Sequence, residues 1–379
     1  MDEAGRIAPF AVRILDDVFA WDAIRADWDR LHAVSPTAST PLDFVWLRSW
    51  WDIFGPVYGN GGLRIITLWR GATLVGALPL YVQKLGLVRC LRFVSTGEDE
   101  AEETCPDYLN LLHMPGEAAA CAEHVWHTVA AMRWDLLECP DLPADSPLLH
   151  ADHALSRRLS LRVISRGKCP IANLSSGLEA YLKQLSANTR SRARREMRKA
   201  RAAGVTFEII GDRARQSQCF EDLVRLHQAR WEAEGRPGCF AAVRFTSFHR
   251  RLLDEWADSG RLLLAQLAYK GQVYVVLYGF VTAGKFDLYQ LGVGALDESG
   301  VSSPGMATNL LLMDQLAAQG IERYDFLRGA SRYKTSLATE QRDLVTLQGR
   351  RFRLRVLLYD AGRFMARALR KVSRMMRHR

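Results

Sequence analysis

The chain has 379 residues, of which 48% are hydrophobic and 25% are charged. This balance is ordinary for a globular protein, and the length allows two domains with buried cores. No apolar run approaches the roughly 20 residues of a membrane-spanning helix, and the acidic start MDEAGRIAPF does not resemble a signal peptide. The seven cysteines form no CxxC pair, which favours a reducing compartment over a disulfide framework. We therefore expect a cytoplasmic protein.

The positive charge is unevenly distributed along the chain. Residues 350–379 carry eleven Arg or Lys against the single acid Asp360, which leaves 40 basic and 41 acidic groups in the first 349 residues. A second cluster, residues 183–201, has eight basic residues and one acid. Such a run is either a solvated helix face or a rim that attracts an anionic substrate or phosphate. Arg190 is the candidate substrate contact in this cluster.

The first 150 residues are predicted to form helices followed by a strand meander. Helices are predicted over 19–34, 44–54 and 117–132, and strands over 63–69, 73–82, 91–94, 108–113 and 134–138. The second helix is expected to stop at Gly55-Pro56. Pro79 predicts an edge or a bulge at the end of its strand. The acidic segment 97–107 (GEDEAEETCPD) is predicted to be a solvated loop.

The second half begins after a boundary predicted at 140–147. Helices are predicted over 179–203, 216–234 and 245–257, and strands over 161–164, 205–210, 262–268, 273–282 and 286–293. This order repeats that of the first half. Trp69-Arg70-Gly71 before a strand parallels Tyr269-Lys270-Gly271, and WDLL at 134–137 parallels YDFL at 324–327. The repeated order predicts a duplicated α/β unit.

The stretch from Ser302 to Leu337 concentrates the chemistry. Its Ser-Ser-Pro-Gly turn precedes apolar residues at helical spacing from Met306 to Ala317, then a predicted strand over 324–327 and a loop that holds Tyr333 and Lys334. A turn that opens a helix presents unpaired backbone N–H groups and the positive end of the helix dipole. It is therefore either a phosphate-binding site or simply a turn that starts a helix.

These residues together resemble the GNAT acyltransferase superfamily. The similarity rests on the meander, the SPG turn, the amphipathic helix, YDFLRG and YK, and it is strongest over 181–337. The closest branch is the acetyltransferase-like domain associated with cellulose and exopolysaccharide biosynthesis, which is distantly similar to Fem-type peptidyltransferases. The resemblance implies an α/β (α+β) fold of tandem GNAT-like domains, each with a mixed, mostly antiparallel sheet flanked by helices. The expected divisions are 1–150, 151–350 and a basic amphipathic tail at 351–379.

The resemblance also implies an acyl-CoA donor, most simply acetyl-CoA, wedged into a sheet that splays open between its middle strands. The strand that contains Leu291 and Val293 would bind the pantetheine arm, and the N–H groups that open the helix would bind the pyrophosphate. The implied cofactor-binding residues of the turn and helix are Ser303, Pro304, Gly305, Met306, Ala307 and Thr308. Because the turn departs from the usual Q/R-x-x-G-x-G/A loop, an aminoacyl-tRNA stays open as the donor.

Acyl transfer needs a base for the nucleophile, a donor for the oxyanion and an acid for the leaving thiolate. Tyr333 is the candidate acid, and Lys334 is a candidate for oxyanion or phosphate binding; the alternative for both is a surface pair. Asp325 is either the base or the partner of Arg328 in fixing the loop, and Arg328 is otherwise a substrate contact. Asp287 and Tyr289, two apart on one strand, either face the substrate or form an outward polar face.

Two further features leave alternatives open. Cys121, His124 and His127 recur along one helix beside Glu123, but a metal site needs further ligands held in geometry, and we expect a structural helix and no metal. The tail is predicted to start as a strand over 351–358 and to continue as a cationic amphipathic helix. Such a helix binds an anionic membrane surface, RNA or an acidic partner.

Three functions are therefore compatible with the sequence. The first is acyl transfer from CoA to an amine or hydroxyl, such as one on a polysaccharide or lipid precursor at the inner membrane face. The second is Fem-type transfer from aminoacyl-tRNA. The third is a non-catalytic accessory role beside a polysaccharide synthase, docked through the tail.

Overall fold

A single large sheet forms the framework of the protein. The computed structural model describes residues 10–296, 299–329 and 331–362. The described strands are β1 (Ala11–Leu15), β2 (Leu63–Arg70), β3 (Thr73–Leu85), β4 (Val88–Phe93), β5 (Leu112–His113), β6 (Leu136–Pro143), β7 (Arg162–Asn173), β8 (Thr206–Ile209), β9 (Leu262–Tyr269), β10 (Gln272–Thr282), β11 (Lys285–Val293), β12 (Arg323–Asp325) and β13 (Glu340–Arg350). They pair in the order β1-β2-β3-β4-β6-β13-β7-β12-β11-β10-β9-β8, and β5 pairs with β3 beside this path.

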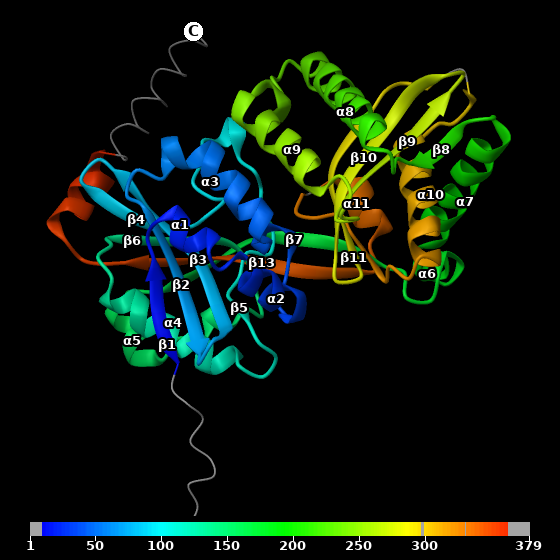
Figure 1. Cartoon of the computed structure of the whole chain (residues 1–379). Helices are drawn as coiled ribbons and strands as arrows, with labels where there is room; N and C mark the ends of the chain where they lie inside the picture. Colours follow the sequence, from blue (N-terminus) through cyan, green and yellow to red (C-terminus); the bar gives the residue numbers. More distant parts are fainter. Residues whose placement is uncertain (1–9, 297–298, 330, 363–379) are drawn as a thin grey trace, which may run out of the picture.

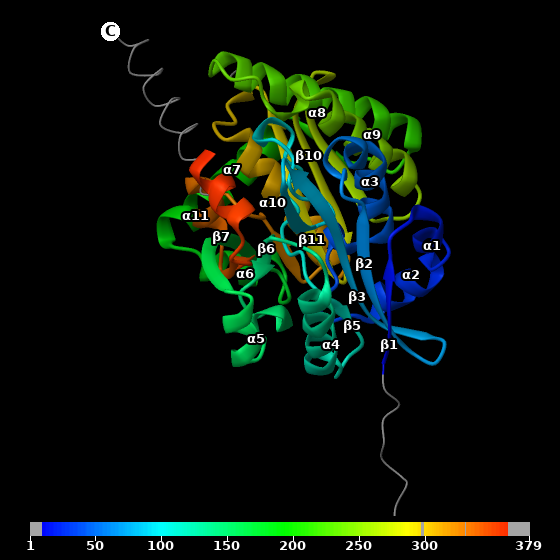
Figure 2. The same cartoon turned by 90° about the vertical axis from the view of Figure 1, so that its left-hand side faces the viewer.

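Helices cover the sheet in two groups (Figures 1 and 2). The described helices are α1 (Val18–Asp22), α2 (Arg25–Val34), α3 (Phe44–Tyr58), α4 (Ala118–Ala131), α5 (His153–Arg158), α6 (Leu178–Gln184), α7 (Ala187–Ala202), α8 (Arg213–Ala233), α9 (Val243–Trp256), α10 (Pro304–Ala318) and α11 (Arg332–Leu337). The mixed, mostly antiparallel sheet flanked by helices confirms the predicted fold class.

The two halves repeat one topology and exchange their last strands. The units β2-β3-β4-α4-β6 and β9-β10-β11-α10-β12 each contain two antiparallel pairings and one parallel pairing, β4 with β6 and β11 with β12. The next strand, β7, pairs with β12 of the second half, whereas β13 pairs with β6 of the first half. β7 and β13 pair with each other and run across the molecule (Figure 1). In the repeated order β7 follows β6 and β13 follows β12, so each repeat contributes its last strand to the sheet of the other. By the division at residue 150, which stays a prediction, both strands belong to the second half.

One aromatic core joins the halves. The side chain of Asp43 caps α3 by accepting a hydrogen bond from the N–H of Val45 at 2.8 Å. The ring of Trp46 on α3 lies 4.9 Å from that of Phe248 on α9 and 5.5 Å from that of Phe280 on β10. Burying these rings contributes a hydrophobic driving force across the boundary between the halves. The boundary is consequently a packed interface.

Several expected elements differ from those in the structure. Helix α3 continues through Pro56 to Tyr58, because a proline in the last turn removes only one internal hydrogen bond. Pro79 lies inside β3, which is not an edge strand. It is tolerated because it falls between the pairing of β5 with Gly76 and Ala77 and the pairing of β4, which begins at Leu80. The strand predicted at 108–113 is reduced to β5.

The helix predicted over 179–203 is two helices, α6 and α7. Ser186 ends the first segment and caps the second, since its side chain accepts a hydrogen bond from the N–H of Thr189. The loop predicted to hold Tyr333 and Lys334 is the short helix α11. The strand predicted over 351–358 is also wrong. Among the described residues the last strand is β13, and a helix begins at Leu354 and is described as far as Gly362. Residues 363–379 of the predicted tail lie outside the described part.

The acidic segment 97–107 is not a solvated loop. Glu102 and Asp107 are buried, because each has partners elsewhere in the structure. Glu102 accepts hydrogen bonds from the hydroxyl of Tyr58 and from the guanidinium of Arg244, which comes from the second half. The segment is therefore part of the boundary between the halves.

Candidate functional site

A cleft opens at the first turn of α10. Its volume is about 970 Å³, and we call it the α10 cleft. Seven of the residues singled out from the sequence line it: Leu291, Val293, Ser303, Pro304, Gly305, Met306 and Tyr333. β11 and β12 pair in parallel only from Lys285/Arg323 to Asp287/Asp325. β12 then ends, whereas β11 continues beside β10 to Val293. The sheet thus splays at this place.

The first turn of α10 offers two backbone donors to the cleft. Pro304 has no N–H, and the N–H groups of Gly305 and Met306 lie too early in the helix to have an acceptor within it. The N–H of Ala307 already donates to the carbonyl oxygen of Ser303 at 3.0 Å. Ala307 and Thr308 are also fully buried. Their predicted role as anion donors therefore does not fit this geometry.

Polar side chains of α7 hold the turn before α10. The N–H of Ser303 donates to the buried carboxylate of Glu196 at 3.0 Å. Arg192 donates to the hydroxyl of Ser303 at 2.6 Å, and Lys199 donates to the hydroxyl of Ser302 at 2.9 Å. Two cations consequently stand at the positive end of a helix, where an anion is attracted.

Arg190 does not line the α10 cleft, although the sequence singled it out. Its guanidinium donates to the carbonyl oxygens of Lys183 and Leu185 at 3.1 and 3.2 Å. These are carbonyls at the end of α6, so Arg190 stabilises the junction between α6 and α7. Arg192, two residues further along α7, is the cation of this helix that lines the cleft.

A second cavity, of about 670 Å³, lies between the halves, and we call it the boundary cavity. Its walls come from the acidic segment of the first half and from α8, β11 and the 327–334 region of the second. Three pairs of consecutive residues divide between the two hollows: Arg230, Leu291 and Tyr333 line the α10 cleft, and Trp231, Gln290 and Lys334 line the boundary cavity. The two hollows therefore lie on opposite sides of one wall, which these three pairs of residues form at the splayed part of the sheet.

Tyr333 and Lys334 have perturbed acid–base properties. Burial raises the pKa of the Tyr333 phenol to about 12, so the phenol keeps its proton at neutral pH and is a donor. Burial lowers the pKa of Lys334, and nearby carboxylates only partly offset this effect. The Lys334 ammonium donates to the carbonyl oxygen of Phe326 at 2.6 Å.

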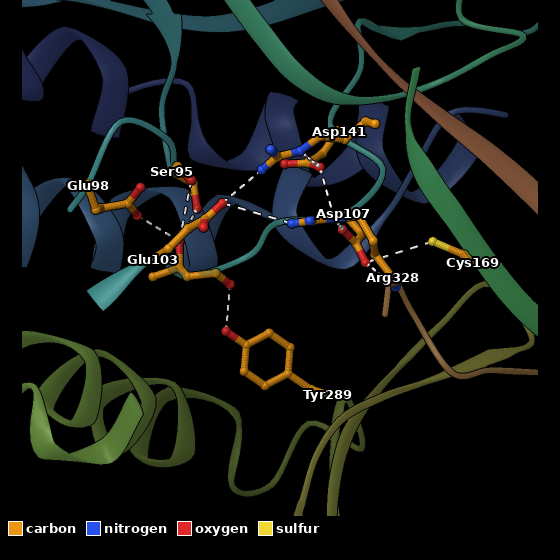
Figure 3. Close-up of polar contacts among 10 residues, drawn as sticks. Ser95, Glu98, Glu103, Asp107, Asp141, Cys169, Tyr289 and Arg328 are labelled. Atoms are coloured by element: carbon orange, nitrogen blue, oxygen red, sulfur yellow. Dashed lines mark hydrogen bonds and ion pairs between the residues drawn. The ribbon is translucent and has the colours of Figure 1, made fainter. Parts of the chain in front are cut away.

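Arg328 is the centre of an ionic network that joins the halves (Figure 3). Its Nε lies 3.2 Å from Asp107 Oδ1 and 3.3 Å from Asp141 Oδ1. Burial, with the charge of Asp141 as a smaller cause, raises the pKa of Asp107 to about 7 against the opposing effect of Arg328. The alternative pairing of Arg328 with Asp325 is wrong, because its acidic partners all belong to the first half.

Strained backbone surrounds this network. Of the eight non-glycine residues with positive φ in the described part of the chain, five lie around it: Ser95, Cys105, Tyr108, Asp141 and Leu327. Their φ angles run from 46° to 78°, a region that costs roughly 1–2 kcal/mol per residue outside glycine. Strain of this kind persists where the surrounding contacts over-determine the backbone, and it gathers at functional sites.

Asp325 and Asp287 belong to a buried cluster rather than to either hollow. Asp325 accepts a hydrogen bond from the hydroxyl of Tyr108 at 2.6 Å and has Lys285 at 3.5 Å. Asp287 lies 2.6 Å from Lys285 and accepts a hydrogen bond from Thr40 at 3.2 Å. Burial raises the pKa of Asp287. Asp325 is fully buried, so its carboxylate does not reach a substrate directly and instead positions the strand end.

Tyr289 lines the boundary cavity and is part of an internal hydrogen-bond chain. Its hydroxyl donates to the carbonyl oxygen of Thr104 at 2.5 Å and lies 3.2 Å from His249 Nε2. Burial lowers the pKa of His249 to about 3, so the imidazole is neutral. The alternative interpretation placed Tyr289 and Asp287 on an outward polar face of the sheet. The structure places both side chains inside the protein.

Two of the candidate metal residues on α4 contact backbone groups instead, and His127 Nε2 lies 3.9 Å from Glu123. The thiol of Cys121 donates to the carbonyl oxygen of Val75, and His124 Nδ1 lies 2.9 Å from the carbonyl oxygen of Ala120. Within residues 10–296, 299–329 and 331–362, the structure contains no group of three or more His, Cys, Asp or Glu side chains placed to hold a metal ion.

Sequence reasoning missed the contribution of the first half to the site. Glu103, Cys105 and Asp107 line the boundary cavity, although the acidic composition of their segment indicated solvent exposure. The one available signal was Cys105-Pro106, an apolar pair inside that acidic run. His227 and Trp231 on α8 were also missed, since a helix alone does not show which of its faces lines a cavity.

The comparisons with known proteins agree with this geometry. A model of the acetyltransferase (GNAT) domain matches residues 187–335, which include the α10 cleft. The solved structure of FemX is similar over 88% of this chain and 96% of its own, with a TM-score of 0.61 and 11% identity. A conserved protein of unknown function from Bacteroides thetaiotaomicron VPI-5482 covers 90% of this chain and 100% of its own, with a TM-score of 0.53 and 11% identity. None of the curated proteins matches the chain.

Proposed function

We propose that the protein is an acyltransferase that moves an acyl group, in the first instance acetyl, from acyl-CoA to an amine or hydroxyl acceptor. The observation that carries the proposal is the α10 cleft, where free helix N–H groups and a cation meet a splayed sheet inside the region that matches the GNAT domain. The boundary cavity on the other side of the wall is the proposed acceptor site. The narrower resemblance to the cellulose- and exopolysaccharide-associated branch has no counterpart among the comparisons, so the acceptor is named only by its nucleophile.

In this proposal the donor lies along α10 and β11. The N–H groups of Gly305 and Met306 bind the pyrophosphate with help from Arg192, and the backbone at Leu291 and Val293 binds the pantetheine arm. Gly305 suits this role because an added Cβ would lie 3.2 Å from Val293 Cγ2, so any side chain crowds the cleft. Ser303 and Pro304 shape the turn.

The chemistry follows from the placement of Tyr333 beside the donor and Lys334 beside the acceptor. The acceptor nitrogen or oxygen attacks the thioester carbonyl carbon, a C–N or C–O bond forms, and the C–S bond breaks. The leaving thiolate takes the proton of the Tyr333 phenol. The proton of the nucleophile passes to a carboxylate of the boundary cavity, for which we propose Glu103, because a third of its side chain is exposed whereas Asp107 is almost fully buried. Lys334 stabilises the oxyanion.

The test is the affinity for CoA, measured by isothermal titration calorimetry. Gly305→Glu places a carboxylate at the mouth of α10, and Gln319→Glu adds the same charge at the exposed end of the same helix. Loss of two hydrogen bonds to a charged group costs about 3 kcal/mol or more, which is over a hundredfold in Kd. We expect that loss for Gly305→Glu and wild-type affinity for Gln319→Glu. Equal affinity in the two variants would remove the pyrophosphate assignment.

The second candidate donor is an aminoacyl-tRNA. The observation in its favour is the exposed basic face of α7, where the side chain of Arg195 is 55% exposed and Arg198 is also exposed. Exposed cations beside a phosphate site suit a nucleic-acid backbone. A shift in melting temperature with tRNA and none with CoA would favour this donor. Indifference to both would favour the non-catalytic accessory role.

Peripheral contact with an anionic membrane through residues 350–379 is part of the proposal. Seven Lys or Arg and no acid lie in residues 363–379, and basic segments are attracted to anionic lipid. Among the described helices, none is long and apolar enough to cross a membrane.

A further inference from the structure

Four large apolar side chains are exposed just after the last strand. Phe352, Leu354, Leu357 and Leu358 have exposed fractions of 80%, 73%, 57% and 61%, and we call them the apolar patch. Leu354, Leu357 and Leu358 are spaced by three and four residues at the start of the helix that begins at Leu354, so they share one face of it. Val356, in contrast, is fully buried. The helix is thus held on the body by one side and presents the patch to solvent.

The arginines that alternate with the patch point the other way. Arg355 donates to Asp135 Oδ1 through Nε at 2.9 Å and through Nη2 at 2.6 Å, and Arg353 lies 3.3 Å from the same oxygen. The guanidinium of Arg351 lies 4.4 Å from the ring centroid of Trp134. Asp135 and Trp134 are both fully buried. The cations therefore have partners within the protein, and this segment leaves its apolar side chains outside.

The exposure of the side chains in this segment is the reverse of that in an amphipathic segment of a soluble protein. A segment that only packs on the body would bury its leucines and leave its arginines in water. Here a buried acid, Asp135, fixes the arginines inward, and its Oδ2 also accepts the N–H of Arg89 at 2.9 Å. Leu87, two residues before Arg89 in the turn between β3 and β4, is 79% exposed. The turn whose Arg89 shares Asp135 with the segment therefore exposes an apolar side chain of its own.

The chain that follows indicates what covers this area. Residues 363–379 contain seven Lys or Arg and no Asp or Glu. Apolar side chains with basic residues directly after them match the two layers of an anionic lipid surface, acyl chains beneath and negative headgroups above. A protein partner with an apolar pocket would not by itself require this run of positive charge.

We infer that the apolar patch inserts into an anionic lipid surface, with residues 363–379 supplying the electrostatic attraction. The inference rests on the proposed membrane contact but is independent of acyl transfer. It assigns the insertion to Phe352, Leu354, Leu357 and Leu358 rather than to the arginines at 350–355, whose guanidinium groups already have partners within the protein.

The test is co-sedimentation of the full chain with vesicles of phosphatidylcholine alone or with 30% phosphatidylglycerol. The test variant is Leu354→Ser/Leu357→Ser/Leu358→Ser, which removes apolar surface without changing charge. The controls are Val243→Ser and Phe19→Ser, at side chains that are 79% and 87% exposed elsewhere on the surface. We expect wild-type protein and both controls to bind the anionic vesicles at least tenfold more tightly than the triple variant, with all melting temperatures within 2 °C.

Three other outcomes would each overturn a different part of the inference: the role of the patch, the membrane contact itself, or the identity of what covers the patch. If the triple variant binds anionic vesicles as tightly as wild type, the basic residues act alone and the patch has no part. If wild type binds neither vesicle, the membrane contact itself is wrong, and CoA titration of the same samples shows whether the acyltransferase proposal survives. If wild type ignores lipid and sediments as a dimer that the triple variant dissociates, the patch is covered by a second copy of the chain.

Discussion

Replacing Arg328 with methionine is expected to lower the free energy of unfolding by about 3 kcal/mol at pH 8. Arg328 is the cation between Asp107 and Asp141, whose side chains are 3% and 1% exposed. Breaking a buried ion pair from one side costs about 3–5 kcal/mol, because the remaining charge is buried without compensation. The lower end applies here, since Arg166 Nε stays 3.0 Å from Asp141.

The size of this effect should depend on pH. The folded-state pKa of Asp107 is raised to about 7, so between its ordinary value and that pKa the folded chain binds more protons than the unfolded chain, and stability falls as pH rises. Removing Arg328 raises this pKa further and strengthens the trend. At pH 5.5 Asp107 is largely protonated with or without Arg328, and we expect a loss of only about 1 kcal/mol there, in the range of an ordinary hydrogen bond.

The assay is urea unfolding at pH 5.5 and pH 8, followed by tryptophan fluorescence and circular dichroism to check that the transitions coincide. The matched control is Arg342→Met. Arg342 on β13 is 45% exposed and pairs with Asp145, which is 72% exposed; an exposed pair contributes 0–1 kcal/mol. A loss for Arg328→Met that is no larger than the control, or that is equal at both pH values, would refute the reasoning.

Two further predictions concern the acid–base residues. Tyr333→Phe removes the proposed acid, so kcat should fall about 100-fold or more while KM for acyl-CoA stays within about twofold. A fall in CoA affinity with unchanged kcat would make Tyr333 a binding residue only. Asp325→Asn should lower the free energy of unfolding by about 2–3 kcal/mol because it disturbs the buried contacts with Tyr108 and Lys285, yet it should leave kcat of the folded enzyme within about threefold. A hundredfold loss of kcat in a folded Asp325→Asn enzyme would instead support a role as base.

Local sequence patterns indicated the elements that form the α10 cleft, while the binding of a donor there stays a prediction. The helix that opens at Pro304, the strand that carries Leu291 and Val293, and the cleft-lining positions Ser303 to Met306 all lie where the pattern indicated. Turn chemistry and helical periodicity act over a few residues, so they can be recognised without knowledge of the fold. The same patterns did not show that the N–H of Ala307 is already hydrogen-bonded to the carbonyl oxygen of Ser303. That pairing depends on which residue makes the first hydrogen bond within the helix.

The boundary cavity was not predictable in this way. Asp107 and Arg328 are 221 positions apart, and nothing in either local sequence indicates the other. The acidic composition of 97–107 favoured solvent because unpaired carboxylates are not buried, and only the fold supplies Arg328, Arg244 and Arg166 as partners. Arg190 and Arg192 were likewise indistinguishable, since a shift of two positions around α7 decides which cation faces the cleft.

The sequence by itself determined most of the elements, the repeat and the stretch that opens α10, because backbone propensity and periodicity are properties of neighbouring residues. The tertiary structure alone decided that β7 and β13 change places between the halves, and that the first half forms one wall of the boundary cavity. It also decided that the arginines after β13 turn inward to Asp135. In each of these cases the deciding free energy is the pairing of groups distant in the chain, and a buried charge is stable only where the fold brings it a partner.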